Sequence, residues 1–248
     1  MLPVLNIAAY RFVELDDLPA LRMRLLERAK AAALAGTVLL APEGINLFLA
    51  GAPDAVRGWL DELRADARFA ALAVKESLSA TVPFGRLRVR IKREIIRMNQ
   101  PTVRPADGRA PAVDALTLAR WLRDGRCDEG RPVLMLDTRN GFEVDRGAFD
   151  GAIDWRLNRF SDFPAALAAH RAGLEGKTIV SYCTGGIRCE KAAIWMREQG
   201  LKHTLQLDGG ILGYFEQVPG AAHFHGDCFV FDAREALDPT LAPVPHAA

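Results

Sequence analysis

The sequence predicts a two-domain α/β protein, with an α/β sandwich in the first half and a parallel sheet in the second. Strands and helices alternate along all 248 residues, a length that accommodates two modest cores. A proline-rich stretch without periodicity, residues 99–113, interrupts the pattern and is typical of a linker. Beyond this linker the strands become continuous apolar runs, as in parallel sheets that are covered on both faces.

The first predicted domain, residues 1–98, has the order β-α-β-β-α-β with one further strand. This order is typical of a ferredoxin-like, or acylphosphatase-like, α/β sandwich. A strand is predicted over 4–13, and helical spacing covers 18–34. The aspartates before that helix would cap it, and Gly36 would end it.

The remaining segments of this domain complete the sandwich. Two apolar runs flank residues 42–44, Pro-Glu-Gly, which predict a hairpin with a tight turn. A second helix is predicted over 53–63, with proline in its first turn. Short strands are predicted over 69–76 and 85–96.

The last of these strands carries a basic stripe, in which cations alternate with apolar residues. Its members are Arg86, Arg88, Arg90 and Lys92. Residues 1–98 have a net charge of +4 and the rest of the chain −3, so the overall +1 gives no global field that would attract nucleic acid. The stripe is interpreted equally well as a solvated strand face and as a surface that contacts the phosphates of a polyanion.

The second predicted domain covers residues 114–235, and 236–248 follow as a flexible tail. Its strands are predicted over 133–137, 178–182 and 205–208, separated by helices. Ligands of such sheets lie beyond the carboxyl ends of the strands. Cys183 falls at one of these ends.

A loop with a cysteine at its start follows the strand at 178–182. Its residues are Cys183, Thr184, Gly185, Gly186, Ile187 and Arg188. Backbone amides of such a loop and of a helix N-terminus form a nest for an anion, and Arg188 adds a positive charge at the rim. Cys183 is therefore predicted to be a nucleophile with a lowered pKa. The alternative is a small buried core cysteine, which the glycines and Arg188 disfavour.

The length of this loop separates two kinds of chemistry. Cysteine phosphatases place five residues between the cysteine and the arginine, whereas four residues intervene here. The smaller ring fits a single sulfur atom, as in a persulfide, and the position before the cysteine is Tyr182 rather than histidine. Phosphatase activity is therefore disfavoured.

Three features together resemble a rhodanese domain: the CxxxxR loop, Asp-Thr-Arg at 137–139 and Asp-Gly-Gly at 208–210. Longer segments resemble the rhodanese-related family of oxygen-dependent tRNA uridine hydroxylases over nearly the whole chain. These segments are YCTGGIRCEKA, LDTRNGFEVDRGAFDGAI at 136–153, APEGINLFLAG at 41–51, LRVRIKREII at 87–96 and FVFDAR at 229–234. Longer family members continue into a cysteine-rich tail, so the resemblance is to a short form.

The resemblance implies hydroxylation of the wobble uridine of tRNA to 5-hydroxyuridine, with molecular oxygen as co-substrate and with no metal or flavin cofactor. It implies that Cys183 is the essential residue, and it makes tRNA the expected partner of the basic stripe. A mechanism consistent with it begins with addition of the thiolate to C6 of uracil, which makes C5 electron-rich toward oxygen. An unpaired anticodon base reaches such a pocket at little unstacking cost.

Other residues near these motifs receive supporting roles. Cys189 is either a resolving thiol for an oxidised Cys183 or a small residue that packs the helix onto the sheet. Asp137 and Arg139 are predicted to hold the loops at the sheet edge. Cys127 and Cys228 are interpreted as structural.

No metal site is predicted, because His223 and His225 would share a strand face without a third ligand. The N-terminus lacks the pattern of a secretory signal, and no apolar run is long enough to span a bilayer. We therefore expect a cytoplasmic protein with reduced thiols and no membrane partner. The oligomeric state stays open.

Two rival functions use the same residues. A rhodanese-type sulfurtransferase would carry sulfur as a persulfide on Cys183. A tRNA-binding or scaffolding protein with a vestigial loop would have no physical need for the cysteine, the glycines and Arg188 together. Hydroxylation is therefore the function predicted here, with the sulfurtransferase as the alternative.

Overall fold

A computed structural model describes residues 3–244 of the chain. These residues group into two compact units. The first unit comprises the described residues up to Arg97 and the segment Phe231–Arg234; the second comprises Met98–Val230 and continues from Glu235. Within residues 3–244, no helix has the length and apolar character that crossing a bilayer would require.

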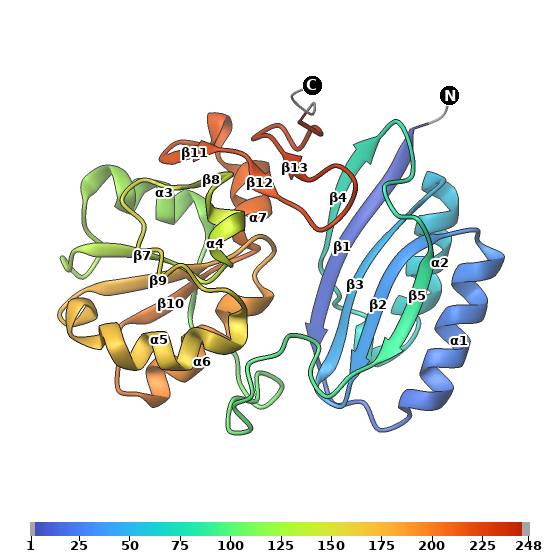
Figure 1. Ribbon diagram of the computed structural model, residues 1–248, viewed down its shortest axis with the longest axis horizontal. Helices are drawn as coiled ribbons and strands as arrows, with labels where there is room; N and C mark the ends of the chain where they lie inside the picture. The colour runs from blue at the N-terminus through green and yellow to red at the C-terminus, as the bar shows by residue number, and fades with distance from the viewer. Residues whose placement is uncertain (1–2, 245–248) are drawn as a thin grey trace. The chain divides into compact units, whose positions relative to one another are not determined.

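The first unit is a five-stranded sheet with two helices on one face (Figure 1). Its elements are β1 (Val4–Phe12), α1 (Leu18–Ala31), β2 (Ala35–Ala41), β3 (Gly44–Gly51), α2 (Pro53–Arg64), η1 (Ala67–Phe69), β4 (Val74–Ser79) and β5 (Leu87–Ile91). The strand order is β4-β1-β3-β2-β5, and β5 runs parallel to β2 at the edge. The first four strands form the antiparallel sheet of a ferredoxin-like sandwich, so the predicted fold class is confirmed.

Apolar periodicity explains why the helices lie on this face. Leu5, Ile7 and Ala9 point inward from β1 at every second position, and α2 buries Val56 and Trp59 at helical spacing. A valine, leucine or isoleucine side chain that is fully buried in this way stabilises the fold by about 1.5–3 kcal/mol.

The first helix is shorter than the sequence predicts. It ends at Ala31 rather than Leu34, because Ala33 adopts a left-handed conformation with φ 52° and turns the chain into β2. Gly36 lies inside β2 with φ 130°, and a Cβ there would come within 2.1 Å of the Phe48 carbonyl. This glycine therefore permits close strand contact and does not end the helix.

Two predicted strands are displaced or shortened. The strand predicted over 69–76 runs from Val74 to Ser79, since Asp66 caps a short 3₁₀ turn that buries Phe69 in the core. The strand predicted over 85–96 ends at Ile91. Beyond it the chain bends, and the Ile95 amide donates to the Glu43 carboxylate at 2.7 Å instead of extending the ladder.

The second unit is a four-stranded sheet with helices on both faces (Figure 1). Its helices are α3 (Ala115–Asp124), α4 (Gly141–Val144), α5 (Phe163–His170), α6 (Ile187–Glu198) and α7 (Gly210–Gln217). Its strands are β6 (Ala112–Val113), β7 (Val133–Asp137), β8 (Gly147–Phe149), β9 (Thr178–Tyr182), β10 (Thr204–Leu207), β11 (Phe224–Gly226), β12 (Cys228–Phe229) and β13 (Ala236–Leu237). The main sheet has the order β6-β10-β9-β7 and is parallel throughout.

This topology brings two separate motifs to one sheet edge. β7 and β9 are adjacent and parallel, and Asp137 pairs in register with Tyr182. The residues at the ends of the two strands, the 137–139 motif and Cys183, therefore lie side by side at the carboxyl ends.

The predicted linker and tail both contain short strands. β6 lies inside the predicted linker, and β13 begins the predicted tail, whose residues 245–248 lie outside the described part of the chain.

Candidate active site

Cys183 begins the loop between β9 and α6, and its side chain is fully buried. The loop is fixed by the start of α7. The Ile211 amide donates to the Cys183 carbonyl at 2.9 Å, and the Leu212 amide donates to the Thr184 carbonyl at 3.0 Å. The shape of the loop is thus held by backbone hydrogen bonds from a separate helix.

Gly210 explains the Asp-Gly-Gly motif at 208–210. A Cβ at this position would lie 2.5 Å from the Cys183 carbonyl oxygen and 2.7 Å from the Gly186 amide nitrogen. Its φ of 62° is also one that L side chains rarely adopt. Only glycine therefore allows α7 to pack directly against the cysteine loop.

The environment of Cys183 favours the thiolate. Gly186, with φ 103°, aims its amide at the Cys183 Sγ at 3.2 Å and precedes the first turn of α6. Burial alone would raise the pKa of Cys183, but the Cys189 thiol, the Arg188 guanidinium and nearby backbone amides lower it to about 5. The predicted lowering of the pKa agrees with this environment.

Cys189 lies directly behind Cys183, with the two Sγ atoms 3.8 Å apart. Its thiol donates to the Gly186 carbonyl at 2.9 Å. Burial and the neighbouring thiolate raise the pKa of Cys189 well above the usual thiol value. Gly186 therefore contacts both sulfurs. Its amide donates to Cys183 and favours the thiolate there, whereas its carbonyl oxygen faces Cys189 and favours the thiol.

Arg188 is not at an exposed rim, as the sequence suggested, but is buried and paired. Its guanidinium donates to both carboxylate oxygens of Glu143 at 2.6 and 2.7 Å, and Glu143 is completely buried. A planar guanidinium needs such a partner when it is removed from water. Glu143 also accepts from the Asn140 amide at 2.9 Å, which fixes it at the start of α4.

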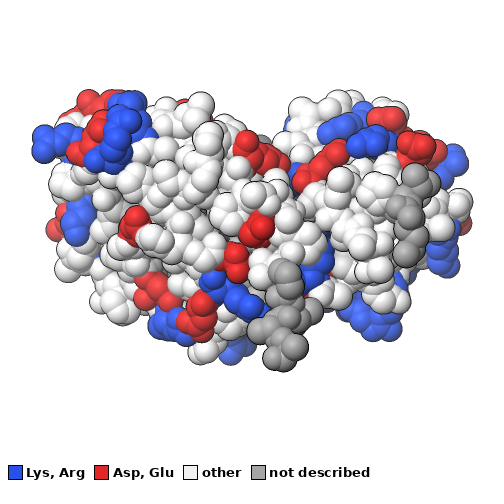
Figure 2. Space-filling model, turned by 90° about the horizontal axis from the view of Figure 1, so that it is seen from above, with Lys and Arg blue, Asp and Glu red and all other residues white. Residues whose placement is uncertain are grey.

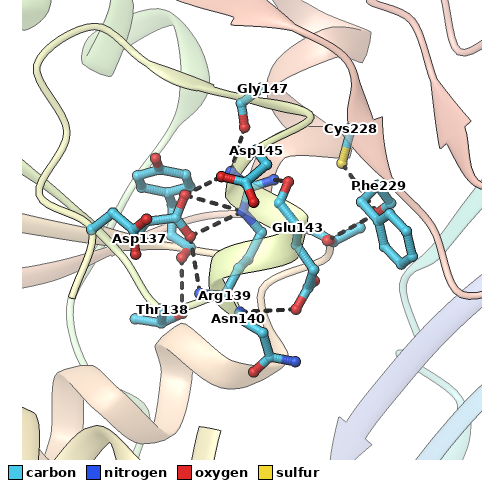
Figure 3. Close-up of polar contacts among 12 residues, drawn as sticks. Asp137, Thr138, Arg139, Asn140, Glu143, Asp145, Gly147, Cys228 and Phe229 are labelled. Atoms are coloured by element: carbon cyan, nitrogen blue, oxygen red, sulfur yellow. Dashed lines mark hydrogen bonds and ion pairs between the residues drawn. The ribbon is translucent and has the colours of Figure 1, made fainter. Parts of the chain in front are cut away.

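Asp137 and Arg139 form a second buried ion pair (Figure 3). Arg139 donates to the Asp137 carboxylate at 2.6–3.1 Å and to the Gly147 carbonyl at 2.6 Å. Between these residues, the Thr138 hydroxyl donates to the Tyr182 carbonyl, one residue before Cys183, at 2.8 Å. These contacts tie the loop after β7 to the end of β9, as expected of supporting residues.

The two remaining cysteines have different surroundings. The Cys127 Sγ lies 3.2 Å from the Thr178 hydroxyl, at the opposite end of β9 from Cys183. Cys228 is fully buried and interacts with the Thr184 side chain of the cysteine loop. Burial raises its pKa to about 12. None of the four cysteines forms a disulfide.

Two aromatic rings adjoin the site, and the sequence did not single them out. Phe142 is 50% exposed and meets Phe229 edge to face, with ring centroids 5.2 Å apart. Phe142 directly precedes Glu143, and the Phe229 carbonyl accepts from the Thr184 hydroxyl at 3.4 Å. No signal in the sequence distinguishes these rings, because single exposed apolar residues are common on protein surfaces.

Charged residues around the loop are mostly structural. Glu190 is buried and forms an ion pair with Arg109 at 3.4 Å, while Arg109 also pairs with Asp208 at 2.8 Å. His223 and His225 both contact Asp150, although only His225 lies in β11. Across residues 3–244 there is no cluster of three or more His, Cys, Asp or Glu residues suited to hold a metal ion.

The basic stripe lies in the first unit, along edge strand β5. Arg88 and Arg90 are on the strand. The Gly36 amide donates to the Arg86 carbonyl and the Lys92 amide donates to the Leu40 carbonyl, so the pairing with β2 extends one residue beyond each end of β5. Arg86, Arg90 and Lys92 are exposed and Arg88 is half-buried. Figure 2 shows acidic side chains beside basic ones on the face seen there.

Comparison with known proteins covers both units. The family model of the UPF0176 acylphosphatase-like domain matches residues 4–95, and that of the rhodanese-like domain matches 118–217. A protein of Variovorax paradoxus named tRNA uridine(34) hydroxylase is 66% identical over 98% of this chain and 92% of its own length. The chain belongs to the tRNA uridine(34) hydroxylase family.

Two further family members confirm the extent of the match. The relative from Bordetella petrii is 65% identical over 97% of this chain and 95% of its own length, and that from Delftia acidovorans is 61% identical over 100% and 94%. Both carry the same name. The resemblance found in the sequence is thus confirmed over both units, in the same order.

Proposed function

We propose that this protein hydroxylates the wobble uridine of tRNA to 5-hydroxyuridine, with molecular oxygen as co-substrate. One observation carries the proposal: Cys183, a buried cysteine with a lowered pKa, lies at the carboxyl end of β9 in a chain that matches proteins named tRNA uridine(34) hydroxylase over nearly its full length. The activity makes the protein an oxidoreductase of tRNA modification.

The mechanism begins with nucleophilic addition. The Cys183 thiolate attacks C6 of uracil, and the electron pair of the C5–C6 double bond moves toward C5 and the C4 carbonyl. The resulting enolate is electron-rich at C5, where molecular oxygen adds. Loss of the C5 proton and departure of the thiolate from C6 then restore the ring and leave a hydroperoxide on C5. Reduction of this hydroperoxide by two electrons and two protons cleaves the O–O bond and gives 5-hydroxyuridine and water.

The residues around Cys183 support these steps. The Gly186 amide, 3.2 Å from the sulfur, stabilises the thiolate before attack and after departure. Arg188 adds positive potential and is held in place by Glu143. Carbanion formation at C5 uses only the thiolate and the ring, and we propose that the reaction needs neither metal nor flavin.

Phe142 and Phe229 supply a surface for the base. Unpaired bases are commonly bound by stacking on aromatic rings, with about 1–3 kcal/mol per base. The half-exposed Phe142 ring adjoins Glu143, and Phe229 adjoins the cysteine loop through Thr184. We propose that a base of the anticodon loop stacks here while the uridine approaches Cys183.

The basic stripe is proposed to hold tRNA phosphates through Arg86, Arg88, Arg90 and Lys92. A variant with both Arg88→Glu and Arg90→Glu should bind tRNA more weakly, and the slope of log affinity against log salt should fall by about 0.9 for each phosphate that is no longer neutralised. Lys30→Glu, an exposed residue on α1, serves as the matched charge reversal. Unchanged affinity and slope in the double variant would make the stripe a solvated face.

The deciding experiment is nucleoside mass spectrometry on tRNA that lacks 5-hydroxyuridine. The purified protein is incubated with this tRNA and a thiol reductant, with and without oxygen, beside Cys183→Ala. A product heavier by one oxygen atom, dependent on both oxygen and Cys183, supports the proposal. Absence of product, together with thiosulfate-dependent persulfide on Cys183, would identify a sulfurtransferase instead.

A further inference from the structure

The electron balance of the proposed reaction requires a donor. One oxygen atom of O₂ enters the C5–H bond of uridine, and the other must be reduced to water by two electrons and two protons. Neither uracil nor oxygen provides these. If the proposed function holds, the chain itself contains a pair of groups that can donate them.

Two thiols are placed to act together. The Sγ atoms of Cys183 and Cys189 are 3.8 Å apart, and both side chains are fully buried. A disulfide bond is about 2.05 Å long, so the two sulfurs need to approach by less than about 2 Å. Cys183 faces the Gly186 amide, whereas Cys189 lies in the first turn of α6.

Their hydrogen bonds give the two thiols different roles. The Gly186 amide donates to Cys183, which leaves that sulfur as an anion ready to attack. The Gly186 carbonyl oxygen lies 2.9 Å from the Cys189 Sγ and disfavours an anion there, which keeps that sulfur a thiol until Cys183 is oxidised. This is the arrangement of a nucleophilic cysteine with a resolving partner.

We propose that Cys183 and Cys189 together supply the two electrons and end each turnover as a disulfide. After Cys183 leaves C6, C5 carries a hydroperoxide, and the Cys183 thiolate attacks its outer oxygen. The O–O bond breaks, the oxygen on C5 keeps the electron pair and takes a proton, and Cys183 becomes a sulfenic acid. Only Cys183 has to face the substrate.

Cys189 then resolves the sulfenic acid. Its sulfur attacks the Cys183 sulfur, the S–O bond breaks, and the departing hydroxide takes the Cys189 proton to form water. In sum, uridine, O₂ and two thiols give 5-hydroxyuridine, water and one disulfide. A dithiol reductant from outside the chain restores the two thiols for the next turnover.

A single-turnover experiment tests this electron source. The protein is reduced, the reductant is removed without oxygen, and an anticodon stem–loop with unmodified wobble uridine is added before air. We expect one 5-hydroxyuridine per chain and then no more, with Cys183 and Cys189 found as a disulfide by peptide mapping. Dithiothreitol should restore turnover. Cys127→Ser, altered at the other end of β9, should behave like the wild type.

Cys189→Ser separates the resolving role from packing. This variant should make its first product, but Cys183 should then remain a sulfenic acid that dimedone traps. Without an added thiol no second product should form, and a small monothiol should restore turnover only in part. Titration of the thiolate absorbance in the same variant measures whether Cys183 is still ionised, so that loss of the nucleophile is recognised separately.

Several results would overturn the inference. These are repeated turnover without any reductant, product formed while all thiols stay reduced, or a disulfide that joins Cys183 to Cys228 instead. Unchanged steady-state turnover in Cys189→Ser would also refute it. Failure to form any 5-hydroxyuridine with dithiothreitol in excess would refute the proposed function itself, which keeps the two claims distinguishable.

Discussion

Cys183 and Cys228 occupy neighbouring regions of the second unit and are equally buried, yet their thiols differ by several orders of magnitude in acidity. The pKa of Cys183 is lowered to about 5, whereas that of Cys228 is raised to about 12. Both sulfurs are withdrawn from water, which disfavours the anion. The difference comes from the loop: Cys183 has amides, a second thiol and Arg188 around it, while Cys228 begins a short strand without these donors.

The largest effect is expected when the sulfur of each cysteine is removed in turn. Cys183→Ser should lower kcat/KM for hydroxylation by about a thousand-fold or more, because the nucleophile is lost. Cys228→Ala should change it by no more than about threefold, with a loss of about 1 kcal/mol in stability. Steady-state kinetics with nucleoside analysis measures both. Comparable losses in the two variants would contradict the assignment.

The pH dependence of stability sharpens the same contrast. In the folded state Cys183 loses its proton at a pH of about 5, whereas an unfolded cysteine does so at about 8.5. Between these values the unfolded chain binds more protons, so the free energy of unfolding should rise with pH by on the order of 1 kcal/mol per unit.

Urea unfolding at several pH values, compared between wild type and Cys183→Ser, checks this dependence. The rise should be smaller in the variant, and it should be lost in the wild type as the pH falls toward 5. Thiolate absorbance should titrate with the same midpoint. A rise of equal size in both proteins would assign it to other groups.

Glu143→Gln tests how the Arg188 charge is held. The amide keeps a hydrogen bond to the guanidinium but leaves a buried cation without a counter-charge, so stability should fall by about 2–3 kcal/mol. Because Arg188 would then be less neutralised, the pKa of Cys183 should fall further. Chemical denaturation and thiolate titration measure the two effects, and a higher Cys183 pKa in this variant would contradict the arrangement.

Phe142→Ala should have the smallest effect and should leave the thiolate unchanged. Loss of one stacking surface weakens binding by about 1 kcal/mol or somewhat more, which should appear in KM for the anticodon stem–loop. Phe142→Tyr should retain binding. Leu116→Ala, which removes another exposed apolar side chain of the same unit (59% exposed), is the matched control. An equal effect in the control would show that Phe142 acts only through general surface packing.

Local patterns predict much of the fold. The two parallel strands at 133–137 and 178–182 are predicted to the residue, since continuous apolar runs have one stable place, inside a covered sheet. Predictions fail where a single backbone contact decides the outcome. Gly36 matches the pattern of a helix end, but its role comes from the Phe48 carbonyl, which is distant in sequence.

The candidate site divides in the same way. Cys183, the glycines and Arg188 are contiguous, so the sequence alone indicates a nucleophilic cysteine. The partner of Arg188 is Glu143, which is 45 positions away, and no local pattern reveals which carboxylate a buried guanidinium meets. Phe142 and Phe229 escape prediction for the same reason, because their proximity arises only when α4 and β12 pack together.

The sequence by itself determined the order of elements, the cysteine loop and the family, because hydrophobic periodicity and contiguous motifs act over short stretches of chain. Only the tertiary structure decided which groups favour the anion on Cys183 and the thiol on Cys189. That distinction depends on Gly186, whose amide and carbonyl face different cysteines, and on a guanidinium held by a distant carboxylate. Charge in a buried site is set by the groups that the fold brings around it, and these come from separate segments of the chain.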